Sequence, residues 1–216
     1  MKNKRAICIM WILSLLPAAL VMACASRLPA QVPIHWNLDG TVDYAPAWNL
    51  WLLAALSPAL ALLFQFLPRI DPRRANYEKF QGRYDTFSMA LPLLLLVLTA
   101  ITLSETFYPG RINVGRATGL LIGVLFLFIG NMMGKLKSNY FIGCRTPWAL
   151  ADPDVWNKTQ RMGGYVFFIT GLAAVLLSLF APEKVFFWVF LALLLGGIVL
   201  TAFMSWKWYQ DKQREN

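Results

Sequence analysis

The chain has 216 residues, of which 58% are hydrophobic and only 14% are charged, and its formal net charge at pH 7 is +9. Soluble domains carry about 25% charged residues, so this composition argues against a soluble protein and for an integral membrane protein. The basic balance alone would also suit nucleic-acid binding, but the positions of the charges indicate membrane topology instead.

Six apolar runs are long enough to cross a bilayer, which takes about 20 helical residues. They contain no Asp, Glu, Lys, Arg or His, and they cover residues 6–25, 48–67, 86–104, 117–134, 165–181 and 185–206. Backbone groups in hydrocarbon must be hydrogen-bonded internally, so runs of this length predict helices and not a barrel. We therefore predict an all-α integral membrane protein, a six-transmembrane helical bundle with short interfacial helices on the cytoplasmic side.

Basic residues concentrate in alternate loops. Every Lys and Arg lies before the first run, in residues 68–85, in residues 135–164 or after residue 206, with the exceptions of Arg27, Arg111, Arg116 and Lys184. Cytoplasmic loops carry the excess of basic residues, so we expect a cytoplasmic-membrane protein with both termini in the cytoplasm, touching the lipid bilayer and not nucleic acid. We divide the chain into an N-terminal module, a middle segment, a C-terminal region and a basic tail: residues 1–67, 68–116, 117–206 and 207–216.

The first run has a second interpretation as a cleaved signal. Basic residues precede it, and residues 21–24 loosely resemble a lipoprotein processing site, which would leave Cys24 lipidated. The run is longer than the core of about 7–15 residues that signal peptides carry, so we expect a retained helix.

Few side chains are available for catalysis or metal binding. The chain has one histidine, and its cysteines, Cys8, Cys24 and Cys144, are poorly placed for a disulfide or a metal cluster. Transporters usually need an ionisable residue inside the membrane, and the apolar runs contain none. We therefore expect no enzymatic activity and no cofactor, with a small-molecule or ion transporter as the alternative to a binding protein.

The first external loop, residues 26–47, combines extended and turn chemistry. Residues 33–36 have the character of a short strand or of a segment lying on the membrane surface, and Asn37 and Gly40 belong to a turn in which glycine takes a positive φ. His35 and Trp36 are either interfacial side chains or contacts for an external ligand. The candidates for ligand contact are His35, Trp36, Asn37 and Gly40.

The stretch from Lys135 to Gly164 is the largest polar island between apolar runs. Arg145 is placed to stack on Trp148 or to pair with Asp152 or Asp154. Asp152 followed by Pro153 predicts a helix start, and one face of that helix carries Trp156, Thr159, Gln160 and Gly163. Such a helix presents its opposite face, with Lys158 and Arg161, to lipid phosphate or to a protein.

Two patterns leave alternatives open. Asp-Pro precedes a glycine and a tyrosine at the same spacing in residues 71–84 and 152–165, which indicates either an ancestral duplication or two short surface helices that each bend at glycine into the membrane. The run at 117–134 holds two small-xxx-small glycine pairs, which serve either packing inside the bundle or homodimerisation. The oligomeric state therefore stays open.

Residues 139–164 resemble the signature of the SdpI-type bacterial membrane immunity family. The matching positions are Asn139, Gly143, Arg145, Thr146, Pro147, Trp148, Leu150, Trp156, Thr159 and Gly163. The external loop around residues 33–40 resembles the N-terminal module that commonly accompanies this signature. Two departures are Cys144, where an aliphatic residue is expected, and Gln160, where a histidine is frequent and would have offered proton transfer.

The resemblance implies protection of the producing cell against a secreted, membrane-acting peptide toxin. In the best-known members it also implies capture of a transcriptional repressor at the membrane, so that toxin sensing switches on immunity. The residues expected to serve partner binding or signalling on the cytoplasmic face are Asn139, Gly143, Arg145, Thr146, Pro147, Trp148, Asp152, Asp154, Trp156 and Lys158. The same residues also suit a purely structural role in anchoring an interfacial helix.

Overall fold

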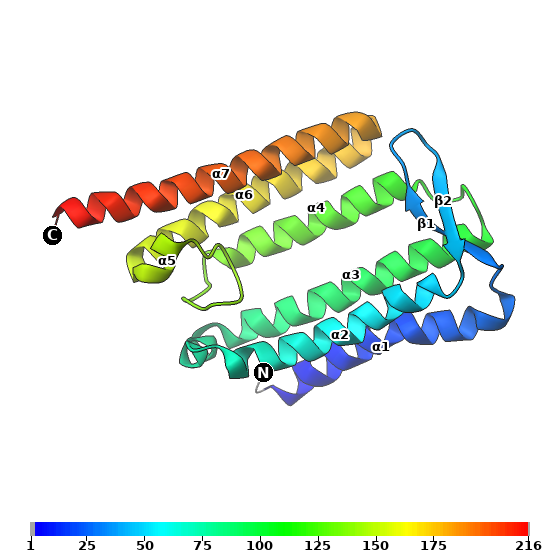
Figure 1. Cartoon of the computed structure of the whole chain (residues 1–216), viewed down its shortest axis with the longest axis horizontal. Helices are drawn as coiled ribbons and strands as arrows, with labels where there is room; N and C mark the ends of the chain where they lie inside the picture. The colour runs from blue at the N-terminus through cyan, green and yellow to red at the C-terminus, as the bar shows by residue number, and fades with distance from the viewer. Residues whose placement is uncertain (1–2, 216) are drawn as a thin grey trace. The chain divides into compact units, whose positions relative to one another are not determined.

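The structure is a computed structural model that describes residues 3–215. In chain order its elements are α1 (Lys4–Cys24), η1 (Ala25–Arg27), β1 (Gln31–Trp36), β2 (Val42–Pro46), α2 (Asn49–Ile70), η2 (Arg74–Phe80), α3 (Gln81–Phe107), α4 (Val114–Met133), α5 (Pro147–Ala151), α6 (Pro153–Phe180) and α7 (Glu183–Glu215) (Figure 1). Six helical segments of the described chain are long and apolar enough to cross a membrane. The predicted all-α membrane fold is therefore confirmed.

Chain contacts divide the protein into two compact units. The first comprises residues 1–66 and 85–118, and the second comprises residues 67–84 and 119–216. Because α2, α3 and α4 each contribute to both units, the division falls within helices and not at linkers.

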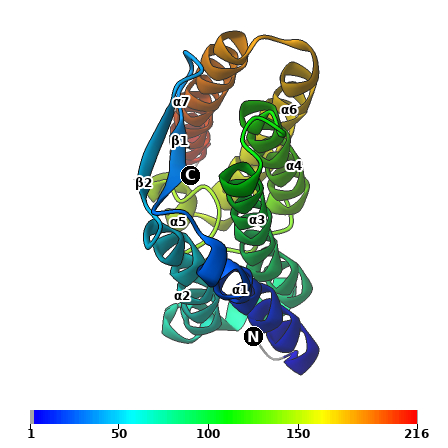
Figure 2. The same ribbon diagram turned by 90° about the vertical axis from the view of Figure 1, so that its right-hand side faces the viewer.

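The first unit carries a β-hairpin, in the loop that the sequence predicts to be external. Strands β1 and β2 pair antiparallel from Gln31–Pro46 to Trp36–Val42, with an irregularity between Pro33 and His35 (Figure 2). Pro33 has no N–H to donate to the ladder, which accounts for the break in register. The expected strand is confirmed, and Gly40 closes the turn with a φ of 88°.

The hairpin is anchored by a hydrophobic cluster. Val32 is fully buried together with Val21 of α1, Leu50 and Ala54 of α2 and Leu103 of α3. On this face the strand packs on helix ends, while His35 and Gly40 remain exposed. At the other end of α1, the Trp11 indole donates to Oε1 of Gln65 over 2.8 Å, so a partly buried polar pair also joins α1 and α2.

The second unit is built on α6 and α7, which run antiparallel side by side after a short connection (Figure 1). The predicted bend at Gly163 and Gly164 is wrong, because α6 continues through both residues from Pro153 to Phe180. These glycines leave room for neighbours. A Cβ on Gly163 would lie 2.6 Å from the Cys144 sulfur, and one on Gly164 would lie 2.9 Å from the Gly130 carbonyl oxygen.

Glycines also bring α4 and α6 into backbone contact. A Cβ on Gly130 would lie 2.6 Å from the Phe168 nitrogen, and one on Gly171 would lie 2.6 Å from the Leu127 nitrogen. We call Gly123, Gly130, Gly164 and Gly171 the glycine seam. Of the two interpretations of the α4 glycines, packing inside the bundle is the one the structure shows, and Gly134 lies outside the seam because its nearest neighbour is a flexible arginine stem at 3.7 Å.

Candidate functional site

Two loops of the second unit meet at a buried carboxylate, Asp71. Its Oδ2 accepts hydrogen bonds from the Tyr77 hydroxyl (3.0 Å) and the Tyr140 amide (2.9 Å), and its Oδ1 accepts from the Arg73 amide (2.7 Å). The side chain is buried, and its bonds compensate for the loss of water. Asp71 differs in this from Asp152, because the helix that follows it, η2, begins after Arg73 with no side-chain cap.

Arg73 makes the second connection between these loops. Its guanidinium donates to the Ser138 hydroxyl and, over 2.8 Å, to the Leu150 carbonyl, and it lies 5.0 Å from the centroid of the Tyr140 ring. Asn76 adds a bond of 2.8 Å to the Ser138 carbonyl. These partners are 62 to 77 residues apart in sequence. We call the set Asp71, Arg73, Asn76, Ser138 and Tyr140 the loop junction.

Asn139 shapes the chain immediately after Ser138. It is fully buried, its Oδ1 accepts from the amides of Phe141 (2.9 Å) and Ile142 (2.7 Å), and its Nδ2 donates to the carbonyls of Lys137 and Ile142. An asparagine amide has both donors and acceptors, so this one side chain satisfies a whole turn. Asn139 therefore has no surface available for a partner.

Gln160 of α6 holds the next segment of the loop. Its Oε1 accepts from the Cys144 amide (3.0 Å) and its Nε2 donates to the Cys144 carbonyl (2.7 Å). Gly143 adopts a φ of 100° beside this amide, where a Cβ would collide with the Gln160 side chain. Gln160 is fully buried, and burial raises the pKa of the neighbouring Cys144 thiol.

Trp156 and two hydroxyls fasten the loop to the helices. The Trp156 indole is 1% exposed and donates to the Leu136 carbonyl over 2.9 Å. Thr146 caps α5 through the Ala149 amide and lies 2.5 Å from the hydroxyl of Ser205 on α7, which also receives a bond of 3.0 Å from Thr159. The predicted inward face of α6 is confirmed, because Trp156, Thr159, Gln160 and Gly163 are all buried.

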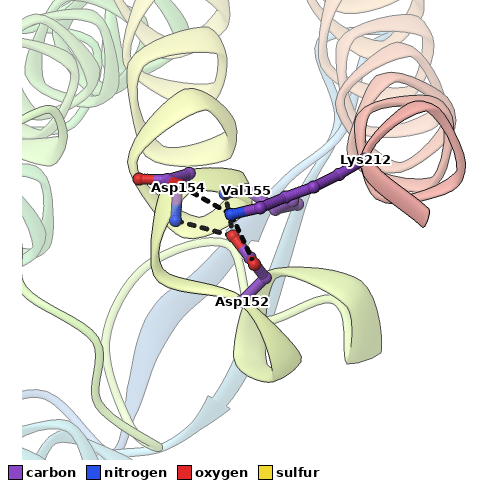
Figure 3. Close-up of polar contacts among 4 residues, drawn as sticks. All are labelled: Asp152, Asp154, Val155 and Lys212. Carbon is purple, nitrogen blue, oxygen red and sulfur yellow. Dashed lines mark hydrogen bonds and ion pairs between the residues drawn. The ribbon is translucent and has the colours of Figure 1, made fainter. Parts of the chain in front are cut away.

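The acidic residues at the start of α6 pair with α7 (Figure 3). Asp152 caps α6 as predicted, accepting from the amides of Asp154 and Val155. Lys212 lies 2.8 Å from the Asp152 carboxylate and 2.6 Å from that of Asp154. The hydrogen bond from Lys212, supported by the two amides, lowers the pKa of Asp152. The expected pairing of Arg145 with these aspartates is wrong, since Arg145 donates to the Tyr140 carbonyl over 2.6 Å.

The sequence-predicted cytoplasmic candidates fall into two groups. Arg145, Pro147, Asp154 and Lys158 are exposed. The others are buried or partly buried: Asn139, Gly143, Thr146, Trp148, Asp152 and Trp156. Sequence reasoning missed the pairing of this loop with Asp71 and Arg73, although the recurrent Asp-Pro pattern had drawn attention to Asp71. It also missed Ser205 and Lys212, for which the sequence offers no local signal.

The external candidates are likewise divided. Trp36 lines a cavity of about 190 Å³ with Pro33, Tyr44, Pro109 and residues of the loop after α3. Glu105 at its edge is buried, and its carboxylate accepts from the amides of Gly110 (2.9 Å) and Ile112 (3.0 Å), which orders that loop.

Asn37 belongs to the hairpin turn and not to the cavity. Its amide nitrogen donates to Thr41 Oγ1 (3.0 Å) and to Asp43 Oδ2 (3.3 Å), and its main-chain N–H donates to the Thr41 carbonyl. His35 and Gly40 are exposed. Of the four candidates predicted in this loop, Trp36 is the one that lines this cavity.

These sites consist of hydrogen-bonded polar groups and exposed charges. No group of three or more His, Cys, Asp or Glu side chains able to hold a metal occurs in residues 3–215. The polar groups of the loop junction form hydrogen bonds that hold the backbone in place, while the side chains of Arg145 and Lys158 are exposed and charged.

Comparison with known proteins agrees with this organisation. Residues 135–205 match the SdpI/YfhL protein family, and residues 12–57 match a domain of unknown function, DUF1648. The chain is 25% identical over 185 residues to the immunity protein SdpI of Bacillus subtilis (strain 168), covering 85% of this chain and 86% of that protein. No solved structure matches the chain. From the polar loop to Ser205, the chain is therefore similar to the SdpI/YfhL protein family.

Proposed function

We propose that this protein is a membrane immunity protein that protects its own cell against a secreted, membrane-acting peptide toxin. The observation that carries the proposal is the similarity to a Bacillus subtilis immunity protein along most of both chains. Separate family matches cover the hairpin region (residues 12–57) and the polar loop (residues 135–205), which supports shared structural features beyond hydrophobicity. We place the protein in the cytoplasmic membrane with both termini in the cytoplasm, as the distribution of basic residues favours.

The external hairpin is the proposed site of toxin contact. Trp36 and Tyr44 face a cavity of about 190 Å³, which suits a single apolar side chain of a peptide. Aromatic side chains supply large contact areas with little conformational freedom to lose, and they concentrate binding energy in interfaces. His35, Asn37 and Gly40 then flank the bound peptide at the rim of the hairpin.

Survival assays test this proposal. Cells sensitive to pore-forming or depolarising peptides should survive a panel of them better when they express the protein. Trp36→Ala should reduce protection, whereas Leu38→Ala, which changes an exposed side chain at the hairpin tip, should not. Unchanged killing by every peptide, at verified membrane expression, would count against immunity.

The proposed signalling role uses the opposite face. Arg145, Asp154 and Lys158 provide exposed charge, and Trp148 and Asp152 lie partly exposed beside them. Asn139, Gly143, Thr146, Pro147 and Trp156 act in this proposal by shaping the loop that presents those groups. The expected partner is a small DNA-binding repressor that is withdrawn from its operator when it binds this face.

Co-purification from membranes tests the signalling role. A DNA-binding protein should be recovered with the wild-type chain, and its recovery should fall with Arg145→Ala or Lys158→Ala at equal expression. Lys184→Ala is the matched control, because Lys184 lies in the first turn of α7, at the opposite end of that helix from Lys212, which pairs with Asp152 and Asp154. Equal recovery with all three variants would contradict the proposed contact surface while leaving the survival assay to decide immunity.

A further inference from the structure

The second unit contains a groove on the flank of α4 and α6 that the immunity proposal does not use. Its volume is about 460 Å³, and its lining includes Gly130, Lys135, Arg161, Gly164, Tyr165 and Phe168. This volume falls within the range of about 300–1,000 Å³ that small-ligand sites occupy. The groove exists because the glycine seam removes side chains at the point where α4 and α6 cross.

The two ends of the groove differ in chemistry. Lys135 and Arg161 lie at one end, and both are exposed. Phe168 follows Arg161 by seven residues on α6, which corresponds to about 10 Å along a helix. Phe168 is 45% exposed within an apolar segment, so the groove leads from two cations onto a hydrocarbon-facing surface.

The two cations of this groove form no ion pair within the described chain. Its lining contains no Asp or Glu, and in the described part of the chain no ion pair engages Lys135 or Arg161. A neighbouring groove offers the contrast. There Lys158 and Lys212 lie with Asp154, Asp211 and Glu215, and Lys212 forms ion pairs, whereas Arg161 lines both grooves without an ion pair in the described part of the chain.

A ligand for the first groove must therefore be anionic at one end and apolar at the other. We propose that it is a binding site for an anionic phospholipid, whose phosphate lies between Lys135 and Arg161 and whose acyl chain lies along Gly130, Gly164 and Phe168. Basic pockets between transmembrane helices select anionic headgroups by charge. The Arg161 stem lies over Gly134, with its Cγ 3.7 Å from the position of a Cβ there, and such an aliphatic stem can lie on apolar surface while its charged end reaches a headgroup.

Native mass spectrometry of the full-length protein in detergent tests the site. Phosphatidylglycerol, phosphatidylcholine and inorganic phosphate are titrated separately, and bound lipid is read as a mass adduct. We expect a phosphatidylglycerol adduct whose affinity falls about fivefold for Lys135→Gln or Arg161→Gln, because each substitution removes one basic residue from the neighbourhood of the anionic headgroup. The double variant should lose about thirtyfold, because the two effects multiply. Arg161→Lys should retain most of the affinity.

Lys158→Gln is the matched control, because Lys158 lies one turn from Arg161 on α6 but outside this groove. It should leave the adduct unchanged. Equal retention of phosphatidylcholine, equal loss with Lys158→Gln, or displacement of the lipid by millimolar phosphate would overturn the proposal. A two-chain complex in place of the lipid adduct would also overturn it, by assigning the groove to a second copy.

Discussion

Replacing Gln160 with alanine should release the segment around Cys144. The substitution removes both hydrogen bonds to the Cys144 peptide, leaving its N–H and C=O without the partners that now lie 3.0 and 2.7 Å away. Each of these two groups costs about 1–3 kcal/mol when it is buried without a hydrogen-bond partner. Because water that enters the loop can bond to them and relieve part of this cost, we expect the loop to be destabilised by about 2–4 kcal/mol.

The thiol of Cys144 provides the assay. Its partial burial and raised pKa keep it protonated and slow to react, because the thiolate is the nucleophile. With Cys8→Ala and Cys24→Ala in the background, maleimide labelling reports on Cys144 alone. If labelling proceeds through local opening, a destabilisation of about 2 kcal/mol should accelerate it about thirtyfold.

Asn157→Ala is the control for this experiment, since it removes an exposed amide from the same helix. It should leave the labelling rate close to that of the parent. A labelling rate for Gln160→Ala that matches the Asn157→Ala rate would refute the reasoning, because the Gln160 bonds would then not limit access to the thiol.

Two further predictions concern helix packing and the ion pair of Figure 3. Gly130→Ala should destabilise the detergent-solubilised protein by about 1–3 kcal/mol, because the new Cβ would lie 2.6 Å from a backbone atom of α6. Gly196→Ala is the control and should be neutral or stabilising, because no atom lies within 4 Å of the Cβ position there. Equal unfolding midpoints for the two variants would contradict the seam. Asp152 should titrate below the ordinary aspartate pKa of about 3.9 by NMR, and Lys212→Met should raise its pKa. Because the pKa of Asp152 is lower in the folded than in the unfolded protein, the ion pair stabilises the fold above about pH 4, and this stabilisation is lost as the pH falls through the folded-state pKa of Asp152. An Asp152 pKa that is the same in Lys212→Met as in the wild type would contradict this prediction.

The sequence determined the features that depend on local chemistry. The lengths of the apolar runs predicted the spans, because crossing hydrocarbon is a property of each segment by itself. The residues around Asn37 and Gly40 predicted the external turn, and Asp152-Pro153 predicted a helix start, because turns and caps are formed by side chains a few residues apart. The amphipathic spacing from Trp156 to Gly163 likewise identified the face of α6 that is buried.

Only the tertiary structure decided which distant residues meet. Asp71 bonds to the Tyr140 amide, Gln160 to the Cys144 peptide and Lys212 to Asp152, and none of these pairings is implied by spacing along the chain. Each depends on which helices pack together and on how closely the glycine seam lets them approach. The continuation of α6 through Gly163 has the same cause, because the identity of a glycine does not reveal whether it permits a bend or makes room for a neighbour.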